Sequence, residues 1–557
     1  MSESETGEPT REPQGEQGED EPEDEPGVTG EPQLDVAPHG IDPAILSRAG
    51  EVLLRHPSVR QYLGAAEHRL LSIVPVEEER KSTSPCEPDR FRAMIYDYTN
   101  GRTVQVEGNL SGMVDSPDEV VLSEFAASPP PSMEEFDAAV DVLQHDRELR
   151  AAIAEGQVVP YRPMPPTVDV QLPDGRIDRV LGVGLRSRDD ARHRFVGVNM
   201  FSRNIIHDLG GLPAPGPGEC EPPPGIDGCG STGTGGQVSV TVTQGGQTVW
   251  NFVAVRPAAS SGTRGSGIEL RFVDYRGKRV LYRAHLPILN VEYLSDGVDA
   301  GCGPTYRDWQ NSEACFQANG NDVIPGYRLC STPAQTILDS GTDVGNFRGV
   351  AIYVQGQEVV LVSEMQAGWY RYISEWRLHV DGTIRPRFGF AGTDNPCTCH
   401  EHIHHAYWRF DFDIRTFWNN VVEEHNDPPI IPGTNWHTKF FEIRRPRDPS
   451  HSRYWRVSNA ATGEGYLLVP GAADGAADAY GVGDVWVLRY HGNELDDGVS
   501  YTATDPAVSI AHLDNFISPA EPVANTDVVL WYVGHFRHDL AHAGGARVGP
   551  DLIPVNW

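Results

Sequence analysis

The densest group of metal-binding side chains in this sequence is a run of histidines at residues 400–405. Four of these six positions are histidine, and only Glu401 and Ile403 interrupt the run. Neutral imidazole is the commonest protein ligand for transition metals such as zinc and copper. The run therefore predicts a metal site, and its chemistry depends on whether the segment is a helix or a strand.

The letters His400-Glu401-x-x-His404 match the zinc motif of metalloproteases. That motif works on a helix, where residues four apart share one face. The residues that follow alternate instead between apolar and polar side chains, from Trp408 to Ile414. Because a period of two is typical of a strand, a zinc metalloprotease is only a remote alternative.

On a strand, residues two apart point to the same face of the sheet. His402 and His404 share their parity with the apolar residue Trp408, so both imidazoles are expected to face a packed interior. Such a pair supplies two ligands of a copper or zinc site. Asp411 and Asp413 lie on the opposite face, where they either hold a hard cation or form an exposed polar edge.

The elements around this strand predict a large all-β sandwich over residues 237–557. Helical periodicity disappears after about residue 237, and short alternating segments separated by turn residues follow one another. The clearest of these segments are 238–242, 249–255, 268–273, 359–362 and 370–380, the last followed by an Asp381-Gly382 turn.

Two small α+β domains are expected before the sandwich, at 41–115 and 130–210. The first combines a helical region over 42–80 with strands at 93–98 and 103–106, which flank an Asn100-Gly101 turn. The second begins its helix at a capping box of Ser132 and Glu135, runs toward Gly156 and continues into strands. The Gly- and Pro-rich segment 211–236 is predicted to be a linker.

The composition excludes several classes of function. The chain has 557 residues with 79 acidic and 45 basic side chains, a net charge of −34. This balance argues against nucleic acid and against anionic membrane surfaces as partners. Residues 1–33 contribute −11 of that charge, and 1–40 is predicted to be a disordered acidic tail. Without an apolar leader or a run of about 20 apolar residues, we expect a cytoplasmic protein.

The histidine strand resembles the strand that provides two copper ligands in the copper-containing, quinone-dependent amine oxidases. The similarity lies in the spacing H-x-H-x-x-x-x-R-[apolar]-D-[apolar]-D, here from His402 to Asp413. The segment 526–534 resembles the family strand that leads to the third copper ligand, which assigns that role to His538, seven residues after Trp531. Three neighbouring histidines stay open as substitutes: His400, His535 and His542.

The same resemblance implies the rest of an active site. The segment 357–376 is similar to the strand that carries the family's cofactor tyrosine, which places Tyr370 where topaquinone forms. Asp299, in Val298-Asp299-Ala300-Gly301, matches the catalytic base, and Tyr293 lies near the tyrosine that hydrogen-bonds the cofactor. A disulfide between Cys315 and Cys330 is also implied. So is a second metal, calcium being one candidate, held by three aspartates: Asp411, Asp413 and Asp527.

The resemblance implies a copper amine oxidase-like supersandwich, a homodimer, and oxidation of a primary amine by O₂ and water to an aldehyde, ammonia and hydrogen peroxide. The cofactor motif departs from the family, because Trp369 and Arg371 flank Tyr370 in place of asparagine and an acidic residue. Three functions therefore stay open. These are a primary-amine oxidase, a copper protein with unmodified tyrosine that oxidises a peptide or natural product, and a copper-binding relative without catalysis.

Overall fold

A computed structural model of the chain describes most of the protein. The described residues are 30–41, 43–76, 81, 89–111, 120–125, 128–129, 131–163, 167, 170–171, 177–187, 193–207, 236–256, 266–292, 306–307, 312–367, 370–392, 401–497, 510–538 and 547–557.

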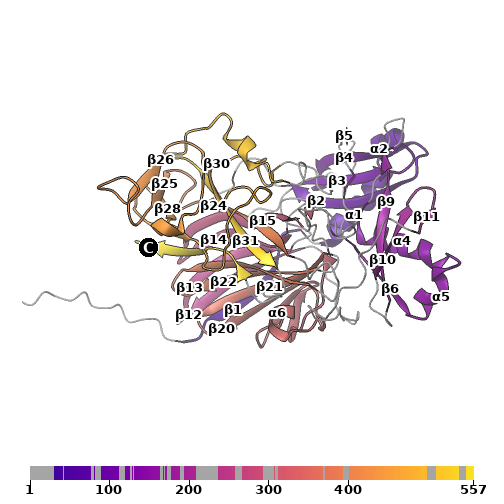
Figure 1. Ribbon diagram of the computed structural model, residues 1–557, viewed down its shortest axis with the longest axis horizontal. Helices are drawn as coiled ribbons and strands as arrows, with labels where there is room; N and C mark the ends of the chain where they lie inside the picture. The colour runs from indigo at the N-terminus through magenta and orange to yellow at the C-terminus, as the bar shows by residue number, and fades with distance from the viewer. Residues whose placement is uncertain are drawn as a thin grey trace, which may run out of the picture.

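Two large sheets packed face to face form the body of the molecule (Figure 1). Within the described residues the first is 10-stranded, with β16 (Tyr306–Arg307) paired to β15 outside the main order. That order is β1 (Gln33–His39), β12 (Gln237–Gln244), β13 (Gln247–Val255), β14 (Ser266–Tyr275), β15 (Lys278–Glu292), β24 (His402–Phe412), β31 (Val528–His538), β30 (Val485–Arg489) and β27 (Ile443–Arg445).

The second large sheet is 13-stranded within the described residues, with β17 (Ser312–Glu313) paired to β21 and β32 (Arg547–Val548) paired to β23. The main order is β18 (Gly320–Ile324), β19 (Tyr327–Cys330), β20 (Val350–Gln355), β21 (Glu358–Ala367), β22 (Tyr370–His379), β23 (Ile384–Gly392), β33 (Asp551–Val555), β29 (Gly465–Val469), β28 (Tyr454–Asn459), β25 (Asn420–His425) and β26 (Trp436–Lys439).

The main apolar core lies between these two sheets. Trp408 and Phe410 on β24 pack with Tyr372 and Trp376 on β22, and all four side chains are buried. The outer face of β24 is covered as well, by an apolar layer that includes Tyr407, Trp486, Leu513 and Trp531. The outer face of β21–β23 is covered by a layer that contains the short helix α6 (Ile337–Ser340). Strands β22 and β24 are therefore buried on both faces, which makes their positions rigid.

Two small α+β units lie beside the sandwich, in indigo and purple in Figure 1. In the first, α1 (Pro43–Arg55) and α2 (Pro57–Leu63) pack with a sheet of β2 (His68–Val76), β3 (Arg90–Asp97), β4 (Arg102–Asn109) and β5 (Val121–Phe125). In the second, α4 (Met133–Gln144) and α5 (Leu149–Ala154) pack with β11 (Ile205–Ile206), β10 (His193–Asn199), β9 (Val180–Ser187) and β6 (Val158–Tyr161). The short strands β7 (Val170–Gln171) and β8 (Ile177–Asp178) pair separately.

The predicted fold class, α+β N-terminal domains before a large all-β sandwich, is confirmed. The predicted Ser132 cap is also present, since its hydroxyl accepts a hydrogen bond of 3.1 Å from the amide of Glu135. The helix that it starts ends at Gln144, however, and α5 begins only at Leu149. No helix among the described residues is long and apolar enough to cross a membrane.

Three predictions about local structure are wrong. The helical region over 42–80 ends at Leu63, because the segment His68–Val76 joins the four-stranded sheet of the first α+β unit as β2. Residues 33–39, predicted within the disordered tail, form β1, which places Leu34 and Val36 against the core. The zinc metalloprotease alternative fails because His404 lies on strand β24 and not on a helix. The predicted linker lies, except for Gly236, outside the described residues.

Candidate metal centre

Three histidines meet between the two sheets of the sandwich. His402 and His404 lie at the start of β24, and His538 ends the neighbouring strand β31, directly opposite His402. All three side chains are buried. As the alternation predicted, His402 and His404 point to the same face, which is the one that meets the second sheet.

The nitrogens of these histidines are spaced as metal ligands are. Nε2 of His402 lies 3.0 Å from Nε2 of His404 and 3.2 Å from Nδ1 of His538. Two imidazole nitrogens at about 2.0 Å from one ion, with angles of roughly 90–110°, lie about 2.8–3.3 Å apart. Burial lowers the pKa of His404 well below its usual range, and the imidazoles of His402 and His538 lower it further. Imidazoles that stay neutral fit copper or zinc.

Tyr370 reaches these histidines from the opposite sheet. It begins β22, and its hydroxyl lies 2.6 Å from Nδ1 of His538 and in close contact with Nε2 of His402. Its neighbour on the same face, Tyr372, places its hydroxyl 3.2 Å from Nδ1 of His404. The two tyrosine rings stack at 5.5 Å with an interplanar angle of 11°. The structure therefore brings the predicted cofactor tyrosine to the three predicted copper ligands.

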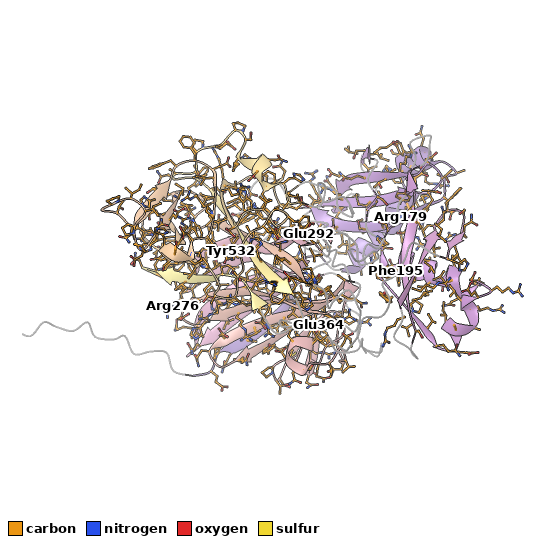
Figure 2. All side chains as sticks on the ribbon, in the orientation of Figure 1. Arg179, Phe195, Arg276, Glu292, Glu364 and Tyr532 are labelled. Atoms are coloured by element: carbon orange, nitrogen blue, oxygen red, sulfur yellow. The ribbon has the colours of Figure 1, made fainter. Side chains whose placement is uncertain are left out.

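A buried ion pair that the sequence did not suggest lies behind Tyr370. The guanidinium of Arg371 donates two hydrogen bonds, of 2.8 and 2.7 Å, to the carboxylate of Asp343. A third, of 3.1 Å, goes to the backbone carbonyl of Tyr370. Burial, reinforced by Asp343, raises the pKa of the nearby Glu364 to about 8. Figure 2 labels Glu364 near α6, and its carboxylate accepts a 2.8 Å hydrogen bond from the amide of Ile337 in that helix.

A second histidine pair occupies the other face of the same two strands. His405 and His535 are directly opposite each other, with their Nδ1 atoms 2.7 Å apart. Nε2 of His535 lies 3.2 Å from the carboxylate of Asp484. His535 therefore points away from the three-histidine group and is not its third member. The other two substitutes that the sequence left open, His400 and His542, lie outside the described residues.

The three predicted aspartates of a second metal site also converge. Asp411, Asp413 and Asp527 place carboxylate oxygens within 4.8 Å of one another. These side chains are largely buried, so the interpretation of Asp411 and Asp413 as an exposed polar edge is wrong. Burial, together with Asp411, raises the pKa of Asp527 above its usual range, and the adjacent ammonium of Lys81 opposes that shift.

The ammonium group of Lys81 lies among these three carboxylates. Its Nζ is 2.5 Å from Asp411 and 2.6 Å from each of Asp413 and Asp527. Burial alone would lower the pKa of Lys81, but the three carboxylates together raise it. The sequence missed this contact, and its one signal was that the chain contains only three lysines, Lys81, Lys278 and Lys439.

Other predicted residues fall outside this centre. Asp299, Tyr293 and Trp369 lie outside the described residues. The prediction of a disulfide between Cys315 and Cys330 is wrong. Cys330 is a free, buried thiol, and Cys315 is bonded to another cysteine. Strand β19 places Cys330 opposite Gly320, in a sheet pairing that Cys315 does not share.

The sequence and the structure give different results when compared with known proteins. No protein-family model and no curated protein sequence matches this chain. Among solved structures, a copper-containing benzylamine oxidase from Hansenula polymorpha superposes with a TM-score of 0.59 at 14% identity, over 93% of this chain and 98% of that one.

Two further oxidases superpose in the same way. An Aspergillus nidulans amine oxidase has a TM-score of 0.53 at 15% identity, over 95% of this chain and 91% of its own. The lysyl oxidase of Pichia pastoris has a TM-score of 0.54 at 12% identity, over 93% of this chain and 89% of its own. At these identities the likeness is one of fold: this chain has the fold of the copper-containing amine oxidases along nearly its whole length.

Proposed function

We propose that this protein is a copper-dependent oxidase of the primary-amine oxidase type, with a quinone cofactor derived from Tyr370. The reaction would convert a primary amine, O₂ and water to an aldehyde, ammonia and hydrogen peroxide. The observation that carries this proposal is the hydroxyl of Tyr370 at 2.6 Å from His538, inside a cluster of three buried histidines. The shared fold with copper-containing amine oxidases supports it.

His402, His404 and His538 would hold the copper. Bound copper supplies one-electron chemistry with O₂, and a quinone supplies an electrophilic electron sink for an amine. The donor set fits this role, since three buried imidazoles are satisfactory ligands for copper. Phe390 packs at 4.7 Å from the ring of His404 and stacks on Phe536 at 5.0 Å, and this aromatic layer excludes water beside the site.

The chain's own residues would position the tyrosine and move the proton. Stacking on Tyr372 and the hydrogen bond from Arg371 to its carbonyl fix Tyr370 on β22. On the resemblance, Asp299 is proposed as the base that removes the α-proton of the amine, and Tyr293 as the residue that hydrogen-bonds the cofactor. A carboxylate acts as such a base most effectively when burial brings its pKa close to the working pH.

A homodimer is proposed on the same resemblance. Equilibrium sedimentation at several concentrations is expected to give twice the mass of the chain. A mass of one chain throughout the series would contradict the dimer without touching the proposal for the metal centre, because every residue of that centre comes from one chain.

The test of function is a comparison of copper-loaded wild-type protein with His402→Ala. We expect the wild type to bind one copper per chain, to give a positive redox-cycling quinone stain and to release peroxide on a panel of primary amines. His402→Ala is expected to lose all three. His405→Ala is the matched control, because it removes an equally buried imidazole from the next position on β24 but from the opposite face.

A second candidate function rests on the residue after Tyr370. Arg371 places a buried cation where the resembled family has an acidic residue, and its pairing with Asp343 fixes it there. In this second candidate function the protein would bind copper while Tyr370 stays an unmodified tyrosine. It would then either oxidise a substrate other than a primary amine or have no catalytic activity. A copper-loaded wild type without stain, and with Tyr370 at its unmodified mass in a tryptic digest, would favour this candidate and overturn the quinone proposal.

A further inference from the structure

The three-aspartate site at the far end of β24 and β31 already contains a cation. We propose that the ammonium of Lys81 is the resident cation of this site in place of a metal ion, and that it binds Lys81 to the two strands that carry the metal centre. The resemblance implied a metal at these aspartates. The contacts of Lys81 disagree with that expectation.

The geometry matches one ammonium to three carboxylates. Lys81 Nζ has three hydrogens, and it donates to one oxygen of each aspartate at 2.5, 2.6 and 2.6 Å. A metal ion would need the same three oxygens. Because Nζ lies at hydrogen-bond distance from all of them, the ammonium and a metal ion exclude each other.

The surroundings also suit an ammonium better than a hard cation. The ring of Tyr490 lies 4.3 Å from Nζ and the ring of Tyr282 lies 5.1 Å from it, both within the range of cation–π attraction. Calcium needs about six to eight oxygen ligands, and the faces of two aromatic rings supply none. The guanidinium of Arg409, 3.6 Å from the second oxygen of Asp411, adds positive charge that would repel a divalent ion.

The burial of Lys81 shows that these contacts stabilise it. Only 3% of its side chain is exposed, and an ammonium so deeply buried is very costly unless it is paired. Three carboxylates and two aromatic rings provide that compensation. The lysine is therefore a fixed part of the sandwich, although it comes from the N-terminal part of the chain.

This contact lies at the far end of the two strands that carry the metal centre. Asp411 is on β24 and Asp527 directly precedes β31, and the same two strands carry His402 and His538 at their other ends. Lys81 follows β2, which ends at Val76. The ammonium thus joins the chain that follows the first α+β sheet to the strand pair that holds the histidines.

The experiment compares wild-type protein, Lys81→Ala and Lys278→Ala in the full chain, each titrated with Tb³⁺. Excitation of tyrosine near 280 nm would sensitise a Tb³⁺ ion bound close to Tyr490 and Tyr282. Lys278 is the matched control, because it also pairs with a carboxylate, Glu464 at 2.6 Å, and lies over an aromatic ring. We expect saturable luminescence of one ion per chain only in Lys81→Ala, where three carboxylates remain and the removed side chain leaves room for water to complete the oxygen ligands. The other two proteins are expected to stay at the same weak background.

Thermal unfolding supplies a second readout. Removal of the ammonium leaves buried carboxylates unpaired, so we expect Lys81→Ala to lower Tm by about 5 °C or more, and Ca²⁺ to restore part of it. EDTA and Ca²⁺ are each expected to leave the Tm of copper-free wild type unchanged. Wild type that carries one calcium or other divalent ion per chain beyond copper, or binds Tb³⁺ as tightly as Lys81→Ala, would overturn the proposal. The wild-type measurements decide the question even if the variant does not fold.

Discussion

The hydroxyl of Tyr370 and Nδ1 of His538 lie 2.6 Å apart, although 168 positions separate the two residues in the chain. Tyr370 belongs to one sheet of the sandwich and His538 to the other. A slip of one residue in the register of β22 would turn Tyr370 to the outer face and break the contact. The packing of the two sheets, and not any local sequence, therefore sets the distance between the tyrosine and the histidines.

Tyr370→Phe separates copper binding from quinone formation. The substitution keeps the ring that stacks on Tyr372 and removes only the hydroxyl at the histidines. We expect one copper per chain to remain, because the three imidazoles are unchanged, while the quinone stain and amine-dependent peroxide release disappear. Metal analysis, staining and a peroxide assay on one preparation check this. A stain that persists in Tyr370→Phe would show that another residue forms the quinone.

Local pattern predicted the strand of the metal centre but not its surroundings. The alternation of apolar and polar residues after His402 predicted that this segment is a strand. It also predicted that His402 and His404 share the inner face of that strand and that Asp411 lies on the opposite face. It could not show that Asp411 is buried, because the covering layer comes from Trp531 and other residues more than one hundred positions away. The contact between Lys81 and Asp411 spans 330 positions, and no periodicity within a segment encodes such a pairing.

The buried pair of Arg371 and Asp343 is expected to matter for stability. Their side chains are 6% and 4% exposed, and loss of one partner leaves a buried charge without compensation. Asp343→Asn should therefore cost about 3–5 kcal/mol in the free energy of unfolding, measured by denaturant titration. Glu67→Gln is the control, because it removes an exposed partner of Arg203 and should cost about 0–1 kcal/mol. Equal effects of the two substitutions would contradict this assignment.

Glu364 should make stability depend on pH. Burial raises its pKa from 4.5 to about 8, and its Oε1 has no hydrogen-bond partner among the described residues. Between these values the folded state keeps the proton that the unfolded state releases, so this group's contribution to stability falls as pH rises from 4.5 to 8. In Glu364→Gln the side chain is neutral over this whole pH range, and its amide oxygen can still accept the 2.8 Å hydrogen bond from the amide of Ile337.

The stability gain of Glu364→Gln over wild type is therefore expected to grow between pH 5 and pH 8, by about 2–5 kcal/mol. Denaturant titrations of both proteins at pH 5 and pH 8 measure this gain. The difference in unfolding free energy between the two proteins removes the contribution of every titratable group that the substitution leaves unchanged. A gain that is constant across this range would mean that Glu364 is ionised in the folded protein throughout.

Cys330 should be unreactive in the folded protein. The thiol is buried, and burial raises its pKa to about 11, so the thiolate that alkylating reagents need is scarce at pH 8. We expect iodoacetamide to label Cys330 only after unfolding, and without any reductant. Cys315 should need reductant as well, because it is disulfide-bonded. Peptide mass spectrometry distinguishes the two, and protection of Cys330 in denaturant without reductant would indicate that it too is bridged.

Two N-terminal truncations should differ because β1 belongs to the sandwich. All seven residues of β1 pair with β12, and the side chain of Gln244 donates a 2.8 Å hydrogen bond to the carbonyl of Gly30. Removal of residues 1–29 retains these contacts, so we expect Tm to stay within about 1 °C of the full chain. Removal of residues 1–40 takes Leu34 and Val36 from the core and leaves β12 as an unprotected edge strand. We expect this protein to unfold several degrees lower and to aggregate on heating, as scanning calorimetry and light scattering would show. If both truncations behave like the full chain, the pairing of β1 with β12 adds nothing to stability.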